Sequence, residues 1–386
     1  MTDQKTILVA PLNWGLGHAT RCIPIISALI KDGFKVIIGG DGTSLDLLKH
    51  EFPKLSTVTL PSYNIEYSRE AGQFKTKMFL QSPRLISAIR AEHKIVERLV
   101  AEYQIDGIIS DNRLGLYTAK VPTVFITHQL QVLSGITTKF TTFLHNRYIK
   151  RFDECWVPDF EKEPNLSGIL GHPEKSLKGV RYLGPLSRFK KSKEPILWDV
   201  LAVLSGPEPQ RTILEEKLIS QLKKYSGKVL IVRGVVEDDF KKEVRGNLTI
   251  LNFLSSKKLE SVFNQSALVI SRSGYTTIMD LAKLGKKAFF IPTPGQAEQE
   301  YLASRLKDLR IAPFKTQEEF RLKDLAGVSV YKGFEEHSFE KSQGLVGVFG
   351  LFKCERKLRT DSKLTLDVNT FIVRLDNMLH NRKTEA

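Results

Sequence analysis

The chain has 386 residues, 41% of them hydrophobic and 26% charged, which is typical of globular proteins and unlike disordered or fibrous chains. One hydrophobic core stops growing at about 250–300 residues, so the length predicts two domains. The formal net charge of +15 calls for an anionic partner: nucleic acid, an anionic membrane surface or a phosphorylated substrate. The sequence has no zinc-finger spacing, no basic helix with heptads and no glycine-aromatic RNA-binding motif, and this argues against nucleic acid.

Cysteine usage and hydropathy indicate the compartment. Cys22, Cys155 and Cys354 are widely separated and odd in number, so we expect neither a disulfide framework nor a zinc cluster. No signal-like start is seen, and no apolar stretch approaches the roughly 18 residues of a spanning helix. The expected location is the cytoplasm, with peripheral attachment to the inner face of the membrane as an open option.

Short apolar runs alternate with helix-like segments in the first half, which predicts a parallel α/β sheet. Strands are predicted at 6–11, 34–40, 56–61, 106–111, 121–128 and 154–159, and helices at 22–32 and 82–103. Proline, glycine and basic residues then interrupt the pattern, and we interpret 184–197 as a linker after an N-terminal domain of residues 1–183.

The alternation resumes in a second domain, residues 198–330. Strands are predicted at 198–206, 228–234, 248–254, 267–274 and 287–294, with helices near 210–224 and 275–284. Two successive open sheets predict two facing, doubly wound, Rossmann-like domains with a ligand cleft at the carboxyl ends of their strands. Residues 331–386, with a helical candidate at 367–382, are expected to be a helical extension that packs back on the domains.

The stretch 267–303, "ALVISRSGYTTIMDLAKLGKKAFFIPTPGQAEQEYLA", contains a strand, a turn and a helix start. Free N–H groups and hydroxyls at a helix N-terminus bind phosphate, although an ordinary capped helix has the same signature. An acidic residue follows within two turns, near enough to reach a ribose diol. The residues concerned are Ser273, Gly274, Thr276, Thr277, Asp280, Gln299 and Glu300. This polar set suits a nucleotide sugar.

This stretch closely resembles the donor-binding half of MurG-type glycosyltransferases, which have a family 28 C-terminal domain and the two-domain GT-B fold. The resemblance implies that Ser273 and Gly274 contact the diphosphate, Asp280 the ribose and Gln299 the transferred sugar. It implies that the backbone of Phe253 and Leu254 reads uracil, and Arg233, Arg272, Thr276 and Thr277 join the donor-binding set.

Three departures from the family pattern concern the donor. The acidic residue is usually Glu and is Asp280 here, and a second Gln is common where this chain has Glu300. UDP-N-acetylglucosamine is favoured, but the sugar is not fixed. The loop 204–212 replaces a glycine-rich phosphate loop; Ser205, Gly206 and Arg211 either serve the diphosphate or form a plain rigid turn.

The stretch 14–25, "WGLGHATRCIPI", resembles the family's N-terminal glycine-rich loop, which ends in Gly-His. Gly15 and Gly17 would bring backbone close to the ligand, whereas a dinucleotide fingerprint needs three glycines. His18 is the predicted base, because Asp111 at the same sheet edge can hold one imidazole nitrogen and leave the other free to accept a proton. His128 is the rival base.

The remaining acceptor-side residues follow two strands. Gln129 accompanies His128 in a segment similar to a His-Glu-Gln segment near the acceptor in the family, and Asn112 follows Asp111. Segments 75–90 and 138–152 interleave basic and apolar residues, a pattern typical of helices on an anionic membrane and of amphipathic helices packed on their own sheet.

Together these features predict an inverting, metal-independent transferase that moves a hexose or N-acetylhexosamine from a UDP-sugar to a lipid-linked or cell-envelope glycan acceptor. No cofactor or metal is expected, because helix N-termini and basic groups can stabilise the leaving diphosphate. Asp238 and Asp239 resemble a metal motif only superficially, since the "VEDDFKKE" segment is typical of a solvated helix. A UDP-sugar hydrolase or epimerase, and a non-catalytic protein that binds nucleic acid or membrane, remain alternatives.

Overall fold

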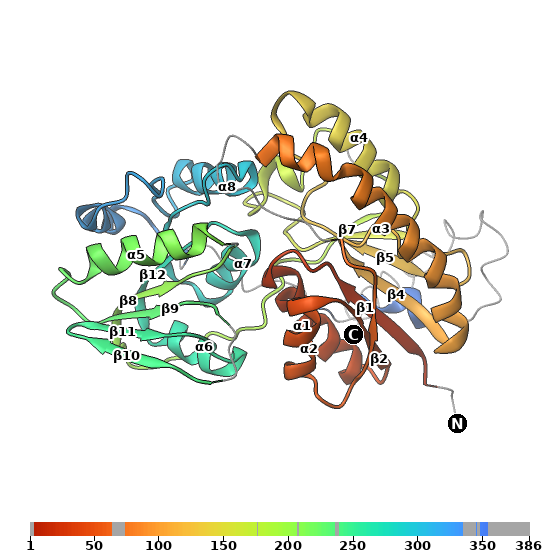
Figure 1. Ribbon diagram of the computed structural model, residues 1–386, viewed down its shortest axis with the longest axis horizontal. Helices are drawn as coiled ribbons and strands as arrows, with labels where there is room; N and C mark the ends of the chain where they lie inside the picture. The colour runs from red at the N-terminus through yellow and green to blue at the C-terminus, as the bar shows by residue number, and fades with distance from the viewer. Residues whose placement is uncertain are drawn as a thin grey trace, which may run out of the picture. The chain divides into compact units, whose positions relative to one another are not determined.

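The computed structural model describes residues 4–63, 74–175, 177–206, 208–235, 239–334, 345 and 348–353, apart from the side chains of 74–83 and 136. The chain divides into two units, residues 1–346 and 347–386, and the larger unit contains two sheets (Figure 1). In the smaller unit, helix α9 (Gly350–Lys353) includes the buried Phe352. The helix predicted at 367–382 lies outside the described residues.

The first sheet has the strand order β3-β2-β1-β4-β5-β6-β7, and its paired strands are parallel. All the strands predicted for this half of the chain are present. The bounds are β1 (Thr6–Pro11), β2 (Lys35–Gly40), β3 (Ser56–Thr59), β4 (Ile105–Asp111), β5 (Thr123–Ile126), β6 (Glu154–Val157) and β7 (Val180–Tyr182). The sequence pattern missed β7, because this short edge strand is not buried and carries no apolar run.

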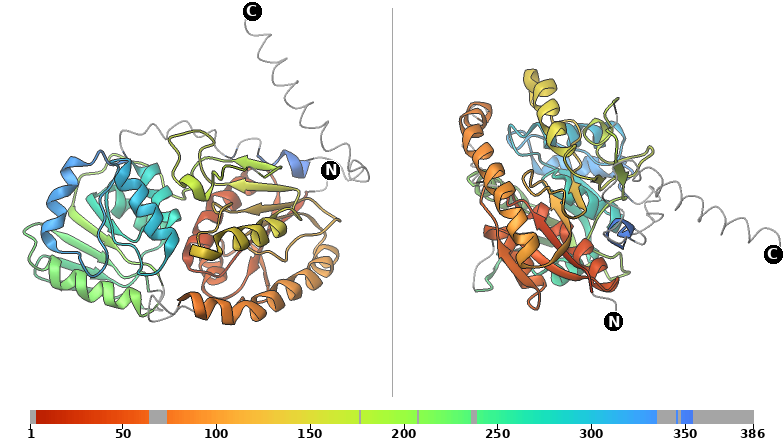
Figure 2. Two further views of the ribbon diagram at one scale, coloured as in Figure 1. Left: turned by 90° about the horizontal axis from the view of Figure 1, so that it is seen from above. Right: turned by 90° about the vertical axis from the view of Figure 1, so that its right-hand side faces the viewer.

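The helices of this half are α1 (Leu16–Lys31), α2 (Gly42–Glu51), α3 (Phe74–Glu102) and α4 (Thr138–Ile149). Because the strand order reverses at β1, α1 and α2 cover one face of the sheet and α3 covers the other (Figures 1 and 2). Helix α1 begins six residues before the predicted start at residue 22. Gly17 has helical backbone angles, so the apparent glycine loop is partly the first turn of a helix.

The second sheet has the order β10-β11-β9-β8-β12-β13. Its strands are β8 (Trp198–Val203), β9 (Val229–Val232), β10 (Lys242–Arg245), β11 (Leu248–Leu251), β12 (Ser266–Ser271) and β13 (Lys287–Phe290). Its helices are α5 (Gln210–Leu222), α6 (Ser256–Asn264), α7 (Tyr275–Leu284) and α8 (Ala297–Asp308). The central strands are buried and apolar, as expected where helices cover both faces of a parallel sheet.

The prediction of a helix around Asp239 is wrong. Residues 239–241 have no helical structure, and β10 follows as an edge strand antiparallel to β11. Edge strands often carry charged, exposed side chains, so the lysines and acids of this segment imitate the composition of a solvated helix. Asp238 lies outside the described residues.

In each sheet, two neighbouring strands are followed by connections that lead in opposite directions along the sheet. In the first sheet these strands are β1 and β4, and in the second they are β8 and β12. Ligands of open α/β sheets bind at the carboxyl ends of such strands. The predicted catalytic residues lie at this edge of the first sheet: His18 comes after β1, and Asp111 is the last residue of β4. The predicted donor turn at Ser273–Gly274 follows β12.

Candidate active site

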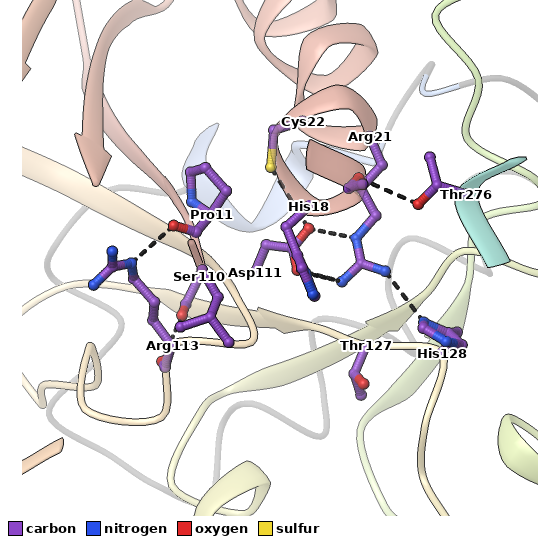
Figure 3. A network of polar contacts seen from close by, with 12 residues as sticks. Pro11, His18, Arg21, Cys22, Ser110, Asp111, Arg113, Thr127, His128 and Thr276 are labelled. Carbon is purple, nitrogen blue, oxygen red and sulfur yellow. Dashed lines mark hydrogen bonds and ion pairs between the residues drawn. The ribbon is translucent and has the colours of Figure 1, made fainter. Parts of the chain in front are cut away.

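His18 and Asp111 are in direct contact. His18 lies in the first turn of α1 and Asp111 is the last residue of β4, with His18 Nδ1 2.7 Å from Asp111 Oδ1 (Figure 3). Asp111 is fully buried, whereas the His18 side chain is 13% exposed. Within the described part of the chain, Nε2 of His18 has no hydrogen-bond partner. The contact expected from the sequence is therefore present, and it leaves one ring nitrogen toward solvent.

Arg21 is a buried member of this site that sequence reasoning missed. Its Nε bonds Asp111 Oδ2 and its Nη2 bonds Asp111 Oδ1, while Nη2 also lies 2.9 Å from His18 Nδ1 (Figure 3). Spaced three residues apart in one helix, His18 and Arg21 share a face, and this spacing was the available signal. Burial raises the pKa of Asp111, but the charges of Arg21 and His18 outweigh it and lower the pKa to about 2.

The protonation of His18 follows from these contacts. A guanidinium has only donors, so His18 Nδ1 cannot both accept from Arg21 and donate to Asp111. The ionised carboxylate is the stronger partner, and we place the Nδ1 proton on the Asp111 side, which leaves Nε2 as the acceptor. Burial lowers the pKa of His18; Asp111 raises it, Arg21 and His128 lower it further, and the net shift is downward.

His128, the rival base, has both ring nitrogens occupied. Nδ1 lies 3.2 Å from Arg21 Nη1, and Nε2 lies 2.8 Å from Oε1 of Glu298 on α8. The ring stacks on Tyr275, with centroids 4.2 Å apart and planes at 5°. The side-chain amide of Gln129 donates to the second oxygen of Glu298. His128 and Gln129 therefore connect the end of β5 to α7 and α8, and Glu298 is a further residue that the sequence did not reveal.

Three residues beside His18 and Asp111 have an unusual backbone conformation or an unusually close neighbour. Gly15 has φ 76°, in the left-handed region that favours glycine. A Cβ atom on Gly17 would lie 3.0 Å from Thr276 Oγ1, and that hydroxyl donates to the Gly17 carbonyl at 3.2 Å. Asn112 has φ 58°, and its buried Oδ1 has no hydrogen-bond partner among the described residues. Left-handed backbone and an unsatisfied buried oxygen are concentrated at ligand sites.

The predicted donor turn is a compact unit. Gly274 precedes the first residue of α7, and a Cβ atom there would meet nothing within 4 Å, so the turn has open space before it. The Ser273 hydroxyl donates to the Gln299 carbonyl at 2.7 Å, and Gln299 Oε1 accepts from the Thr293 N–H at 2.9 Å. The structure therefore brings Ser273, Gly274 and Gln299 together.

Two further members of the predicted donor set lie beside this turn. Thr277 is partly buried in the first turn of α7. Glu300 is exposed and accepts from the Gly295 N–H at 2.9 Å. Neither side chain is enclosed by the domain, so both remain in the predicted set.

Arg272 has its hydrogen-bond partners within the second domain. Arg272 is 1% exposed and donates to the carbonyls of Ile291, Pro292 and Gln210 and to the Gln317 side chain. Its guanidinium is enclosed by its own domain, and the prediction that it contacts the donor is not supported by these contacts.

The Asp280 carboxylate also has a protein partner. It accepts a 2.6 Å hydrogen bond from Ser187 in the segment between the two sheets. Burial raises the pKa of Asp280 to about 6, although the nearby Arg188 and the Ser187 hydrogen bond lower it. A ribose at Asp280 must therefore displace or share the Ser187 hydroxyl.

Arg211 and Arg233 line a cavity of about 300 Å³ in the second domain, together with Asn252. Both bind Glu215 of α5: Arg233 Nε at 2.6 Å and Arg211 Nη1 at 3.2 Å. The half-buried Phe253 and the buried Leu254 directly follow Asn252, and the exposed Ser205 and Gly206 follow β8. In the described parts of the chain, no three His, Cys, Asp or Glu side chains are grouped as ligands for one metal ion. The expectation of a metal-independent reaction stays a prediction.

Sequence comparison identifies the second domain. Residues 206–342 match the glycosyltransferase family 28 C-terminal domain, which spans the donor turn and the cavity described above. The chain has the GT-B fold, contains a family 28 C-terminal domain and is similar to MurG-type glycosyltransferases. The resemblance and the fold expected from the sequence are thereby confirmed.

Similar proteins align with most of the chain. An uncharacterised glycosyltransferase of Methanosarcina mazei is 24% identical over 76% of this chain and 81% of its own length. A Haemophilus ducreyi UDP-N-acetylglucosamine–N-acetylmuramyl-(pentapeptide) pyrophosphoryl-undecaprenol N-acetylglucosamine transferase is 22% identical, covering 81% of this chain and 85% of its own length. The crystal structure of CalG4, the calicheamicin glycosyltransferase, superposes with a TM-score of 0.59 at 13% identity, covering 97% of this chain and 100% of CalG4.

Proposed function

We propose that this glycosyltransferase is inverting and metal-independent, and that it moves a hexose or N-acetylhexosamine from a UDP-sugar to a hydroxyl of a lipid-linked or cell-envelope glycan. The observation that carries the proposal is the 2.7 Å contact of His18 Nδ1 with Asp111, which leaves Nε2 as a proton acceptor. Thr276, one residue into the donor-side helix α7, touches the same turn of α1. UDP-N-acetylglucosamine is the favoured donor, because the Haemophilus ducreyi relative is named for it.

The transfer follows from these positions. His18 Nε2 accepts the proton of the acceptor hydroxyl while the hydroxyl oxygen attacks the anomeric carbon. The bond from that carbon to the diphosphate breaks, UDP leaves with the electron pair, and attack from the opposite face inverts the configuration. Asp111 stabilises the resulting imidazolium through Nδ1–H, as the buried carboxylate of a catalytic triad does. The N-terminus of α7 at Ser273–Gly274 stabilises the charge that develops on UDP.

Different parts of the second domain would contact different parts of the donor. Arg211 and Arg233, on the cavity wall, and the Ser205–Gly206 loop would bind the diphosphate, and the backbone of Phe253 and Leu254 would read the uracil. Gln299 and Glu300 would contact the transferred sugar at the start of α8. Arg–phosphate hydrogen bonds are charge-assisted, and they are worth most where water is excluded.

We further propose that the protein works in the cytoplasm, bound peripherally to an anionic membrane surface. Helix α4 exposes Phe140 and Phe143, which are 63% and 61% exposed, next to Lys139 and Arg147. Such mixtures of apolar and basic residues bind anionic bilayers. None of the described helices is long and apolar enough to cross a membrane. In segment 75–90, the side chains up to residue 83 lie outside the described set, and Arg84, Ile86 and Arg90 are exposed.

The test is a UDP-release assay over a panel of UDP-sugars, with and without membrane lipid extract. The proposal expects release that depends on lipid extract for one UDP-sugar. Release of UDP and free sugar without acceptor would instead support a hydrolase, and conversion into another UDP-sugar would support an epimerase. Failure of the protein to bind any nucleotide sugar by calorimetry would contradict all three enzymes.

A further inference from the structure

We propose that Glu298 is a positioning residue for the base: through His128 and Arg21, the second domain supplies the negative charge that balances protonated His18. This rests on the proposed role of His18 in glycosyl transfer. Glu298 lies on α8, and it was not among the residues expected from the sequence.

A continuous series of contacts joins Glu298 to the base. Glu298 Oε1 lies 2.8 Å from His128 Nε2, His128 Nδ1 lies 3.2 Å from Arg21 Nη1, and Arg21 bonds both oxygens of Asp111. Asp111 in turn holds His18 at 2.7 Å. Only the first of these contacts crosses from the second domain to the first, so Glu298 is the point at which the series depends on α8.

The hydrogen-bond directions leave Glu298 with a defined task. Arg21 can only donate, so His128 Nδ1 accepts a hydrogen bond from Arg21, and the protonated Nε2 donates a hydrogen bond to Glu298. The other oxygen of Glu298 accepts from the Gln129 amide, and the His128 ring lies flat on Tyr275. Glu298 therefore fixes the tautomer and edge orientation of His128, and with them the position of Arg21 between the two histidines.

Charge gives the reason for a carboxylate at this position. The ionised groups are Asp111, Glu298 and Arg21, so the cluster carries −1 while His18 is neutral and becomes neutral when His18 takes a proton. Without Glu298 the same step would create an uncompensated positive charge in a largely buried site, which is costly. Among the described residues, Arg21, Asp111 and His128 carry the contacts of His18 and Glu298, and Cys22 and Tyr275 are the titratable groups that contact Asp111 and His128. Burial raises the pKa of Cys22 and of Tyr275 well above neutrality, so neither takes part.

The titration of Glu298 is consistent with this coupling. Burial raises the pKa of Glu298, but the hydrogen bond from His128 and the electrostatic interactions with His128, His18 and Arg21 outweigh it and lower the pKa. Coupling between two sites is reciprocal, so ionised Glu298 must favour the protonated form of His18.

The experiment uses Glu298→Gln, which removes the charge but keeps the shape and one acceptor oxygen for His128 Nε2–H; its NH2 group then faces the Gln129 amide, which can rotate to accept from it. Histidine NMR on the substrate-free full chain, with the His18 resonance identified by its loss in His18→Asn, should show a lower His18 pKa in Glu298→Gln. The acidic limb of kcat/KM should move to lower pH with it, and kcat should fall several-fold up to about 10-fold because a weaker base accepts the proton less readily. The KM for the UDP-sugar should stay constant, and Glu298→Asp should restore most of the wild-type pH profile.

Glu163→Gln is the matched control. The Glu163 carboxylate lies 3.0 Å from Arg305 of α8, so it also connects the first domain to α8, but it does not touch the histidines. The proposal expects wild-type titration of His18 in this variant. An unchanged His18 pKa in Glu298→Gln, or an equal change in Glu163→Gln, would overturn the proposal even in an active transferase. Because the NMR titration needs no turnover, absence of transfer in the wild-type protein would count against the proposed function and not against the coupling.

Discussion

Arg21 holds Asp111 by both carboxylate oxygens, Nε to Oδ2 and Nη2 to Oδ1, with both side chains buried. Such two-point pairs are the most strongly oriented ion pairs in proteins. Because Arg21 lies one helical turn after His18, a single turn of α1 supplies both the cation that keeps Asp111 ionised and the histidine that Asp111 orients. The position of the predicted base therefore depends on this ion pair.

Removing Arg21 should destabilise the protein. In Arg21→Gln, Asp111 remains buried with its charge only partly compensated by His18, and losing one partner of a buried pair typically costs about 3–5 kcal/mol. Urea unfolding measures the loss. Arg245→Gln is the control, since Arg245 and Glu243 form an exposed pair on β10 and such pairs contribute at most about 1 kcal/mol. Equal losses in the two variants would contradict the assignment of Arg21 as a buried support.

The two histidines should differ in their effects on rate. His18→Asn should lower kcat by about 10²–10⁴-fold, the usual contribution of a general base, and leave the Kd for UDP nearly unchanged. His128→Asn should lower kcat less, because both nitrogens of His128 are bonded to the protein. Single-turnover kinetics measure the effect of each substitution on the chemical step, and UDP titration measures its effect on UDP binding. A larger loss of kcat in His128→Asn would assign the base to His128, and loss of UDP binding in His18→Asn would indicate a structural role.

The pH dependence should follow the lowered pKa of His18. Burial lowers this pKa from its ordinary value of 6.5, so His18 is neutral at pH 7 and loses its ability to accept a proton only as the pH falls through the lowered pKa. The acidic limb of kcat/KM should thus lie below pH 6.5. In Asp111→Asn the limb should move lower still, because the charge of Asp111 raises the pKa of His18. An acidic limb above pH 6.5 in the wild-type enzyme would contradict this assignment.

The fold was largely predictable because parallel strands buried on both faces are short, nearly continuous apolar runs. Those runs predicted both ends of β1 and the start of β8 at the observed residues, whereas β8, β12 and β13 end three or four residues earlier than predicted. The misses lie at edges: β7 and β10 have few apolar residues, and β10 is charged like a solvated helix. The start of α1 was missed because Gly17 suggests a loop, although here its lack of a side chain serves the contact with Thr276.

The site was predictable where chemistry is tied to strand ends, and less so where it depends on contacts between helices. His18 and Asp111 follow adjacent strands, so topology brings them together. Glu298 is 170 residues from His128 in the chain, and nothing in its neighbourhood distinguishes it from the exposed Glu300. The environment of Arg272 was not predictable, because a basic residue after a strand looks the same in the sequence whether its guanidinium faces a phosphate or the carbonyls of its own domain.

Asp280 should give the folded state a measurable pH dependence. Its folded-state pKa of about 6 is above the unfolded value, so the folded state binds more protons between these pKa values, and stability falls as pH rises through this range. A shift of about two units corresponds to about 3 kcal/mol. Urea unfolding from pH 4 to pH 7 should show this decline in the wild-type protein and not in Asp280→Asn. The exposed Asp46→Asn is the control, and a decline that persists in Asp280→Asn would assign it to another group.

Membrane attachment should depend on the exposed aromatic residues of α4. Phe140 and Phe143 can insert into the headgroup region, while each nearby basic residue adds about 1 kcal/mol on an anionic surface. The double variant Phe140→Ser and Phe143→Ser should therefore bind vesicles containing an anionic phospholipid at least 10-fold more weakly in a sedimentation assay.

Phe240→Ser is the matched control, because Phe240 is 60% exposed but lies on the second domain, away from α4. Binding to vesicles of neutral lipid should be weaker in the wild-type protein and should respond little to salt. Equal losses in the α4 double variant and in Phe240→Ser would indicate nonspecific adsorption and remove α4 as the membrane-binding helix.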